Sequence, residues 1–450
     1  MSSALRTTAA ERGSEDASSS VSASHGLASE ESRNRNTTMW AQALVLFNVV
    51  GIPLSYGTYL EFYFNSTHTN KSLTSLSIPV ALQILCILSM PFAAGYVYHR
   101  LGDKWWWRLI FVASSCAALS AQVALQWLHA YLFILVFQGF VLGVALGVLF
   151  TISTLVLASH YKNNIPLVSM QSGFASFLGA VIYSILARQS FRTQYSGRSG
   201  FAQAASAGLL GGTLLCACIL MKRVKEDQTK PESIQHRLKI RWPQGLMQDL
   251  AREGAAWFIL GYMLVFFGIF IYPIYIVLVL ASTPTLGFPD SCTTTLLVCL
   301  GIAALSACVV GNDCACTRVG PVNMLVTASI FGGAVLLAPV RLQLLAITTT
   351  LGAMYGLALG SFLALHIMVA AVFLSPNKMW AEDMPARVAI VMVLGGLSAF
   401  AGIVSLAVVM EAYEHGVDIA LRIAGASVVV GGAMVGAVRM KKWRRLGYVV

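Results

Sequence analysis

Charged side chains are scarce in this sequence. Asp, Glu, Lys and Arg make up 11% of its 450 residues, whereas they make up about a quarter of an ordinary soluble domain. Hydrophobic residues make up 57%, and they gather in runs of about 20 residues, the length of helix that crosses a bilayer. Short alternating segments of the β-barrel type are also lacking, since a run such as 261–280 is apolar on every face. The composition therefore excludes an ordinary soluble protein and favours a bundle of membrane helices.

Several catalytic and nucleotide-binding motifs are missing. No Gly-x4-Gly-Lys-Ser/Thr sequence occurs, so we do not expect a nucleotide-driven pump. His-Glu-x-x-His, Gly-x-Ser-x-Gly and paired membrane aspartates are absent too, which argues against an intramembrane enzyme. We therefore expect no enzyme activity and no catalytic residues.

Paired cysteine spacings are lacking as well. The nine cysteines fall mostly inside apolar runs, and no second Cys or His pair follows Cys314 and Cys316 at zinc-site spacing. We expect neither a metal nor another cofactor. The net charge of +11 comes from Lys and Arg in the polar connections, so it reflects membrane topology and we expect no nucleic-acid partner.

Twelve long apolar stretches are present, in two sets of six. The first set predicts helices over residues 40–63, 75–98, 106–127, 130–159, 165–187 and 201–221, and the second over 255–281, 292–312, 320–339, 342–374, 386–410 and 417–439. The predicted fold class is all-α, a polytopic membrane protein with twelve transmembrane helices in two six-helix bundles. The expected domains are a disordered cytoplasmic tail (1–38), an N-terminal bundle (39–221), a cytoplasmic linker (222–253), a C-terminal bundle (254–440) and a basic cytoplasmic tail (441–450).

The distribution of positive charge predicts the orientation in the membrane. With both ends in the cytoplasm, all but six of the 30 Lys and Arg residues lie on that side, as the positive-inside rule requires. The exceptions are Lys71, Arg188, Arg192, Arg198, Arg341 and Arg422. The first outer connection then carries two sequons, so Asn65 and Asn70 are predicted N-glycosylation sites. We expect the plasma membrane first and the vacuolar membrane next, because the C-terminal residues match no lumenal retention signal.

The connection between the second and third helices carries a recognisable pattern. It reads Gly95-Tyr-Val-Tyr-His-Arg100-Leu-Gly102-Asp-Lys104, and the matching place in the second half keeps the glycine and arginine spacing at Arg318 and Gly320. In such a loop, glycine allows a tight turn, and the cation interacts favourably with the C-terminal end of a helix. The pattern resembles the cytoplasmic loop signature of the major facilitator superfamily, and the resemblance implies the major facilitator fold.

Other local patterns resemble the fungal monocarboxylate-porter-like branch of that superfamily. They include Tyr56-Gly57 in helix 1, Gln138-Gly139 in helix 4, Tyr272-Pro273 in helix 7 and Tyr355-Gly356 in helix 10. The resemblance implies a secondary active or facilitative transporter of a small organic solute, a monocarboxylate or related organic anion, by alternating access. Two arginines of that branch are replaced here, by Val309 in helix 8 and near Ser206 in helix 6. Because arginine grips a carboxylate best, import or export of a neutral metabolite or vitamin is an alternative, and so is a non-transporting sensor of the same fold.

The resemblance also implies which residues face the solute. Helices 1, 4, 7 and 10 are expected to line a central path that holds the solute near the midplane. The polar and aromatic candidates on these helices are Asn48, Tyr56, Tyr59, Gln138, Tyr272, Tyr275, Tyr355, Ser361 and His366. Protons are further expected partners, with His366 and Glu61 as the coupling candidates. The alternative roles are interfacial anchoring, interhelical bonding and packing.

Glycine and proline predict how the helices pack and bend. Glycines recur every fourth residue at Gly139, Gly143 and Gly147 and again at Gly352, Gly356 and Gly360. This spacing puts each set on one helix face and predicts close packing against a neighbouring helix. Pro273 predicts a local break in helix 7.

Overall fold

The structure is a computed structural model, and it describes residues 32–65, 71–101, 105–127, 130–160, 173–193, 200–223, 254–281, 289–311, 319–338, 345–374 and 384–442. Within these ranges eleven helices are long and apolar enough to cross a membrane, and a twelfth apolar helix has 17 residues, Pro321–Leu337. The predicted all-α fold of twelve membrane helices is confirmed.

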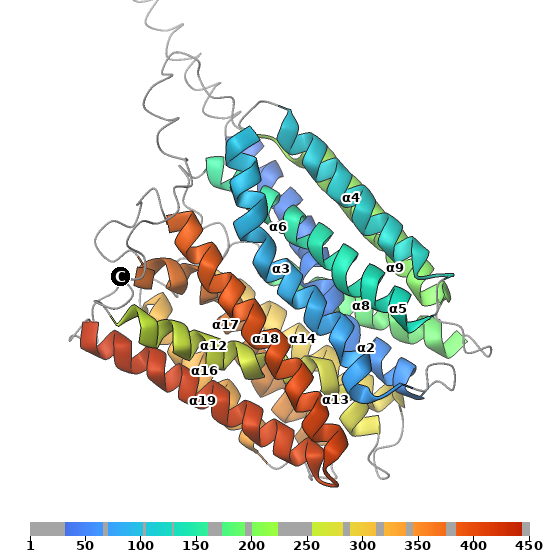
Figure 1. Cartoon of the computed structure of the whole chain (residues 1–450), viewed down its shortest axis with the longest axis vertical. Helices are drawn as coiled ribbons and strands as arrows, with labels where there is room; N and C mark the ends of the chain where they lie inside the picture. Colours follow the sequence, from blue (N-terminus) through green and yellow to red (C-terminus); the bar gives the residue numbers. More distant parts are fainter. Residues whose placement is uncertain are drawn as a thin grey trace, which may run out of the picture.

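The N-terminal half is drawn in blue to green in Figure 1. Its first helix runs over Ser32–Asn65, and α2 (Gly51–Asn65) is the outer part of that helix. The others are α3 (Leu73–Leu101), α4 (Trp106–Ala124), the continuous run of α5 (Tyr131–Phe133), η1 (Ile134–Val141) and α6 (Leu142–His160), α8 (Gly173–Thr193) and α9 (Gly200–Leu220).

Helix 1 begins earlier than the predicted boundary at residue 39. The extra turn is held by Thr38, whose hydroxyl lies 2.8 Å from the carbonyl oxygen of Asn34 and 2.9 Å from that of Lys222, just after α9. A polar sequence without large apolar side chains therefore continues the helix, because the bundle supplies hydrogen bonds that the pattern does not reveal.

The C-terminal half is drawn in yellow-green to red in Figure 1. Its helix 7 consists of α12 (Ala255–Ile269) and α13 (Ile271–Ala281). The remaining helices are α14 (Pro289–Gly311), α16 (Pro321–Leu337), α17 (Leu345–Leu374), α18 (Met384–Ala412) and α19 (Gly416–Lys442).

Helices 1 and 7 are interrupted at the same relative place. The helical pattern breaks three residues before Pro53 in helix 1 and three residues before Pro273 in helix 7. Proline lacks an N–H, so the carbonyl four residues earlier is left without its helical partner. In helix 7 that carbonyl belongs to Ile269, and the hydroxyl of Tyr355 on α17 donates to it at 2.6 Å. The predicted break in helix 7 is confirmed, and a neighbouring helix satisfies the freed carbonyl.

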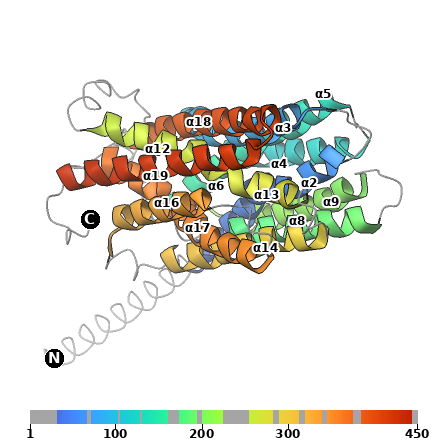
Figure 2. The same cartoon turned by 90° about the horizontal axis from the view of Figure 1, so that it is seen from below.

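The two halves meet mainly along three helix pairs. Helix α3 packs against α18, α8 against α14, and α2 against α13. Figures 1 and 2 show α3 beside α18, and in Figure 2 α2 and α13 lie between that pair and the pair formed by α8 and α14. Helices 1 and 7 therefore lie on the central axis of the molecule.

The glycine faces of helices 4 and 10 pack as predicted. A Cβ added at Gly143 would lie 3.0 Å from the Cα of Gln83 on α3, and one added at Gly356 would collide with the backbone of Cys299 on α14. Each helix therefore approaches its neighbour backbone to backbone, as only glycine permits.

A further glycine contact occurs once in each half. The Cα of Gly179 on α8 faces the backbone of Phe47 in helix 1, and the Cα of Gly402 on α18 faces the backbone of Phe267 in helix 7. A Cβ at either glycine would overlap the facing carbonyl group. Helix 5 is thus held against helix 1 in the same way as helix 11 is held against helix 7.

Parts of the predicted organisation lie outside the described residues. They are most of the N-terminal tail, Asn70, Gly102, Lys104, Arg318, most of the linker (224–253) and the basic tail from residue 443, together with the side chain of Arg100. Gly95 is buried near the inner end of α3. Gly320 has φ +85° directly before α16, a conformation that glycine adopts without strain.

Candidate functional site: a cavity between the two halves

A cavity lies where the two halves meet. It encloses about 810 Å³ of space, including the part open to the surroundings. Its walls come from helix 1, α3, α6 and α8 of the first half and from helix 7, α17 and α18 of the second. Most of the lining is apolar, and Ser176 and His366 are the polar residues among the described lining residues. The cavity therefore suits a small organic molecule.

The cavity extends toward the side that the charge distribution assigns to the cytoplasm. Gly173, the first residue of α8, lines it, and this end of α8 faces inward in the predicted topology. Leu363 and His366 lie in the inner half of α17 and line it too.

The opposite side of the interface is closed. A Cβ added at Gly57 on α2 would lie 2.5 Å from the carbonyl oxygen of Pro273 on α13, so these helices touch backbone to backbone. At the outer end of the α3–α18 pair, Thr74 donates to the carboxylate of Glu411, its hydroxyl at 2.8 Å and its N–H at 3.3 Å. With the charge-based orientation, the structure is an inward-facing state.

His366 is the one of the nine predicted path residues that lines this cavity. Its side chain is 8% exposed, and its Nδ1 lies 2.8 Å from the carbonyl oxygen of Leu363. The other ring nitrogen, Nε2, is buried without a hydrogen-bond partner among the described residues. A buried polar atom of this kind normally has a partner, and His366 lines the cavity, so the residue is a candidate contact for a solute.

Aromatic rings surround His366. The imidazole centroid lies 5.7 Å from that of Phe266 and 6.4 Å from that of Tyr262 on α12, and 6.2 Å from that of Phe362 on α17. Phe266 itself lines the cavity, as does Phe270 one turn later. We call His366, Tyr262, Phe266 and Phe362 the aromatic cluster.

Asn48 bonds within the N-terminal half instead of lining the cavity. Its Nδ2 donates to the carbonyl of Leu44 at 2.8 Å and to Thr213 of α9 at 2.9 Å, and its Oδ1 accepts from the hydroxyl of Tyr183 on α8 at 2.6 Å. The side chain therefore joins helices 1, 5 and 6.

The other candidates of the first half are buried as well. The hydroxyl of Tyr56 donates to the carbonyl of Leu76 on α3 at 2.7 Å, and that of Tyr59 lies 2.9 Å from the hydroxyl of Ser206 on α9. Gln138 is 3% exposed inside the π-helix η1, and its Oε1 has no partner among the described residues. A role for these three residues in the path stays a prediction.

Three candidates of the second half bond to its own helices. Tyr275 donates to the carbonyl of Ile403 on α18 at 3.0 Å, and the Ser361 hydroxyl lies 2.7 Å from that of Ser306 on α14. Tyr355 holds the freed carbonyl of helix 7 described above.

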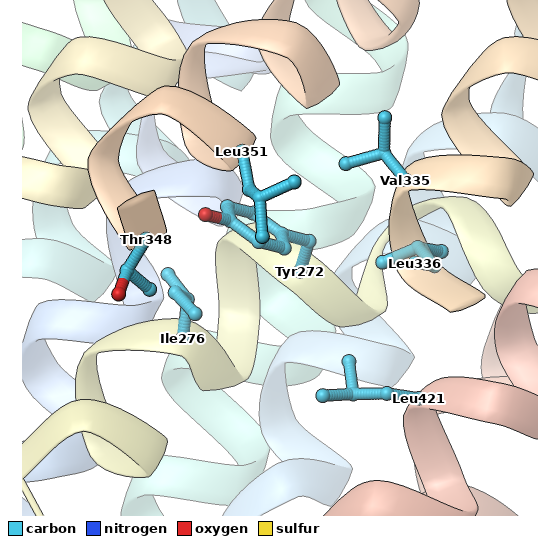
Figure 3. Close-up of a pocket in the computed structure, with 7 residues that line it drawn as sticks. All are labelled: Tyr272, Ile276, Val335, Leu336, Thr348, Leu351 and Leu421. Carbon is cyan, nitrogen blue, oxygen red and sulfur yellow. The ribbon is translucent and has the colours of Figure 1, made fainter. Parts of the chain in front are cut away.

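Tyr272 lines a second, smaller cavity inside the C-terminal half. This cavity encloses about 350 Å³, including open space, between α13, α16, α17 and α19. Figure 3 shows Tyr272 at its centre, with Thr348 and Leu351 of α17 beside the ring. The Tyr272 ring also lies against that of Tyr355, with centroids 4.7 Å apart. The second cavity does not lie between the halves, so Tyr272 is not placed with His366.

Glu61 lies near the outer end of α2, away from His366. Its carboxylate accepts from the amide of Asn65 at 2.9 Å and lies 3.7 Å from the guanidinium of Arg188 on α8. Glu61 is 8% exposed, whereas Asn65 is exposed at the end of the helix. Proton coupling through Glu61 and glycosylation at Asn65 stay predictions.

Sequence reasoning missed most of the cavity wall. Leu46, Val50, Phe150 and Phe270 all line it, yet each is an apolar residue in an apolar helix. A spacing of four residues between Phe266 and Phe270 marks one face of helix 7 and was the available signal. Val309, the aligned position of one missing arginine, is 62% exposed on the outside of α14, so a side chain there does not reach the cavity.

Metal ligands are not grouped in the described part of the chain. No cluster of three or more His, Cys, Asp or Glu residues lies close enough there to hold an ion.

Comparison with protein families identifies the family to which this chain belongs. Residues 38–402 match the family described as Major Facilitator Superfamily. The chain belongs to this superfamily.

Three fungal transporters resemble the sequence. The MFS-type transporter eupM of Phoma sp is 27% identical over 151 residues, which are 33% of this chain and 52% of that protein. The MFS-type transporter dbaD of Emericella nidulans is 25% identical over 69% of this chain and 64% of its own length, and the agnestins efflux protein AgnL12 of Paecilomyces divaricatus is 22% identical over 73% and 71%. The match thus spans about half of eupM and less than two thirds of dbaD.

Solved transporter structures share the fold. The nucleoside transporter NupG superposes with a TM-score of 0.64 at 13% identity, over 90% of this chain and 99% of that one. The proton:xylose symporter XylE gives 0.64 at 12% identity over 93% and 96%, and the human organic anion transporter MFSD10 gives 0.58 at 14% identity over 90% and 99%. At these identities the likeness supports the fold alone.

Proposed function

We propose that this member of the superfamily exports a small organic solute by alternating access. The observation that carries the proposal is the cavity between the halves, closed on the outer side by α2 with α13 and by α3 with α18. A cavity in this state exchanges a solute with the cytoplasmic side. The similarity to the agnestins efflux protein supports export as the direction.

The substrate is proposed to bind where helices of both halves contribute to one wall. Leu46 and Val50 of helix 1 line the cavity together with Phe266 and Phe270 of helix 7. Rocking of one half against the other would then move the bound solute from one side to the other. Export to the outside requires the plasma membrane, which is the proposed location.

Transport into inside-out vesicles tests the proposal. Vesicles from cells that make the protein should accumulate a labelled organic solute from a panel of aromatic and aliphatic neutral compounds and carboxylates, with saturation. Measurement at two pH values tests proton coupling through His366 or Glu61. Absence of saturable accumulation of every compound, with the protein folded and in the membrane, would overturn the proposal.

A cavity-filling substitution and its matched control sharpen this test. Val50→Trp places a large ring in the cavity wall. Leu397→Trp places the same ring on the surface of α18, at a position that is 47% exposed. Val50→Trp should reduce the rate at least about tenfold, because a filled site cannot bind. Leu397→Trp should leave the rate near that of the unmodified protein.

A further inference from the structure

His366 lines the cavity and has one buried ring nitrogen without a hydrogen-bond partner among the described residues. Its Nδ1 lies 2.8 Å from the carbonyl oxygen of Leu363. A carbonyl oxygen only accepts, so Nδ1 carries the hydrogen and, in the neutral imidazole, Nε2 has the free lone pair. That atom is buried and has no partner among the described residues, while the side chain lines the cavity wall. The wall therefore offers a position for a hydrogen-bond donor on the solute.

The surroundings of this acceptor select for a flat apolar molecule. Phe266 and Phe362 lie with their ring centroids 5.7 and 6.2 Å from the imidazole, and Phe270 lines the cavity one turn from Phe266. Aromatic rings bind other rings through stacked or edge-to-face contacts. Phe266 and Phe270 are the rings of this group that line the cavity, and Phe266 lies beside the imidazole.

The polarity of the wall separates candidate solutes. A carboxylate oxygen only accepts, so it does not pair with a nitrogen that also accepts, whereas a hydroxyl group donates to it. Ser176 supplies a second polar group, and the rest of the described lining is apolar or glycine. An ionised solute would lose its hydration there without a described counter-charge. These features favour a neutral solute over an organic anion.

We infer that the aromatic cluster is a recognition site for neutral, hydroxylated aromatic solutes, whose O–H donates to Nε2 of His366. The inference rests on the proposed function, because it names the solute class of the same cavity. His366 selects the solute by this bond, and the rings hold the plane of the solute. The monocarboxylate implied by the family resemblance is replaced by a phenol-like class.

Three matched probes test the inference by equilibrium binding to the full chain in lipid nanodiscs. They are 1-naphthol, its methyl ether 1-methoxynaphthalene, and 1-naphthoate, which share one ring system and differ in the polar group. The naphthol should bind about tenfold more tightly than the ether, the difference expected for one buried hydrogen bond. The naphthoate should bind most weakly of the three.

Variants at His366 separate the acceptor from the apolar wall. His366→Phe keeps a ring and removes the acceptor, so the naphthol and the ether should bind equally. His366→Gln keeps an acceptor oxygen and should retain part of the preference. His415→Phe, at an exposed position directly before α19, is the control and should keep the full preference. Thermal unfolding of each variant confirms that it is folded.

The outcomes distinguish this inference from the transport proposal. Equal binding of naphthol and ether by the unmodified protein, tightest binding of the naphthoate, or an unchanged preference in His366→Phe would overturn the recognition site. Such a result together with saturable export of another solute would leave the transport proposal standing. The expected binding pattern without export of any compound would support the recognition site and overturn the transport proposal.

Discussion

At the scale of single residues, Asn48 shows what a polar side chain in a membrane helix does when it does not meet a solute. Three helices share its amide, through bonds of 2.8, 2.9 and 2.6 Å to Leu44, Thr213 and Tyr183. A bilayer offers no water to these groups, so each of them must find a partner inside the protein. Asn48 is therefore a packing residue of the first bundle.

Asn48→Leu should destabilise the first bundle without changing solute affinity. The substitution leaves the hydroxyls of Tyr183 and Thr213 without this partner, at a cost of about 1–3 kcal/mol. Unfolding of the purified protein in increasing denaturant measures the loss. Thr213→Val keeps the bonds of Asn48 to Leu44 and Tyr183 and should cost less. Normal stability together with lost binding of the naphthol probe would contradict this assignment and return Asn48 to the solute path.

The candidate site was predictable from sequence only in part, and the reason is the uniformity of the helices. His366 was identifiable as a histidine deep in the long apolar helix α17. Asn48 and Tyr275 were equally identifiable, yet they bond to neighbouring helices. A helix that is apolar all round does not reveal which face meets a cavity. The lining residues Val50 and Phe150 carry no polar group that could have marked them.

At the scale of helices, the outer end of α3 is capped by residues of both halves. The N–H of Ser75 donates to the hydroxyl of Ser72 at 3.2 Å, a local cap, while the N–H of Thr74 donates to Glu411 of α18 at 3.3 Å. The first N–H groups of a helix have no partner within it and favour a negative charge. Glu411 thus supplies a negative charge at the start of α3, whose own first turn has no acidic residue.

Glu411→Gln should favour the outward-open state. Separation of α3 from α18 at this end breaks the bonds to Thr74, and a neutral amide makes them weaker than a carboxylate does. Because the pair is exposed to solvent, we expect a shift of about threefold in the equilibrium between the two states. Distances between spin labels on the outer ends of α3 and α18 measure this shift.

Glu414→Gln is the matched control for that measurement. Glu414 is exposed in the turn between α18 and α19 and loses the same charge. It should leave the distance distribution unchanged. An equal shift in both variants would mean that net charge on the outer surface acts, and not the bonds to Thr74.

Helix packing and bending were the most predictable features at this scale. Glycine at every fourth residue and proline inside a helix act through the backbone, so their effects follow from position alone. The contacts of Gly143 and Gly356 and the break before Pro273 agree with this. The break before Pro53 carries the same signal and was overlooked. The capping of α3 by Glu411 was not predictable, because these residues lie 337 positions apart.

At the scale of the whole molecule, the contact between α2 and α13 sets which side of the cavity is closed. Gly57 lets the backbone of α2 approach the carbonyl of Pro273 so closely that an added Cβ would lie 2.5 Å from its oxygen. Real Cβ atoms do not come this near to a backbone atom. The closed contact between α2 and α13 therefore depends on the absence of a side chain at residue 57.

Gly57→Ala should shift the protein toward the outward-open state. The methyl group forces α2 away from α13 only in the state in which they touch, so the two states are affected unequally. A cost of about 1–3 kcal/mol, typical of overpacking, corresponds to a shift of at least fivefold. Labelling of an introduced cysteine at Ser55 by a membrane-impermeant thiol reagent from the outer side measures it. Gly208→Ala, where an added Cβ meets nothing within 4 Å, should leave the labelling rate unchanged.

The two halves place their cavity-lining residues at equivalent positions relative to proline and glycine, but the side chains at these positions differ. Leu46 lies seven residues before Pro53, and Phe266 lies seven residues before Pro273, and both line the wall. In helices 4 and 10 the equivalent wall residues are Phe150 and Leu363.

This register pairs His366 with Ser153, six residues after the last glycine of each packing face. Both bond to a carbonyl three residues earlier, Ser153 to that of Phe150 at 3.0 Å and His366 to that of Leu363 at 2.8 Å. Ser153 donates its one hydrogen to its own helix and is not among the residues that line the cavity, whereas His366 lines the cavity and has a second ring nitrogen without a partner among the described residues. The two halves therefore share a backbone arrangement at this position but carry different side chains, Ser153 and His366. Solute preference can be redesigned at residue 366 while the duplicated glycine contacts stay in place.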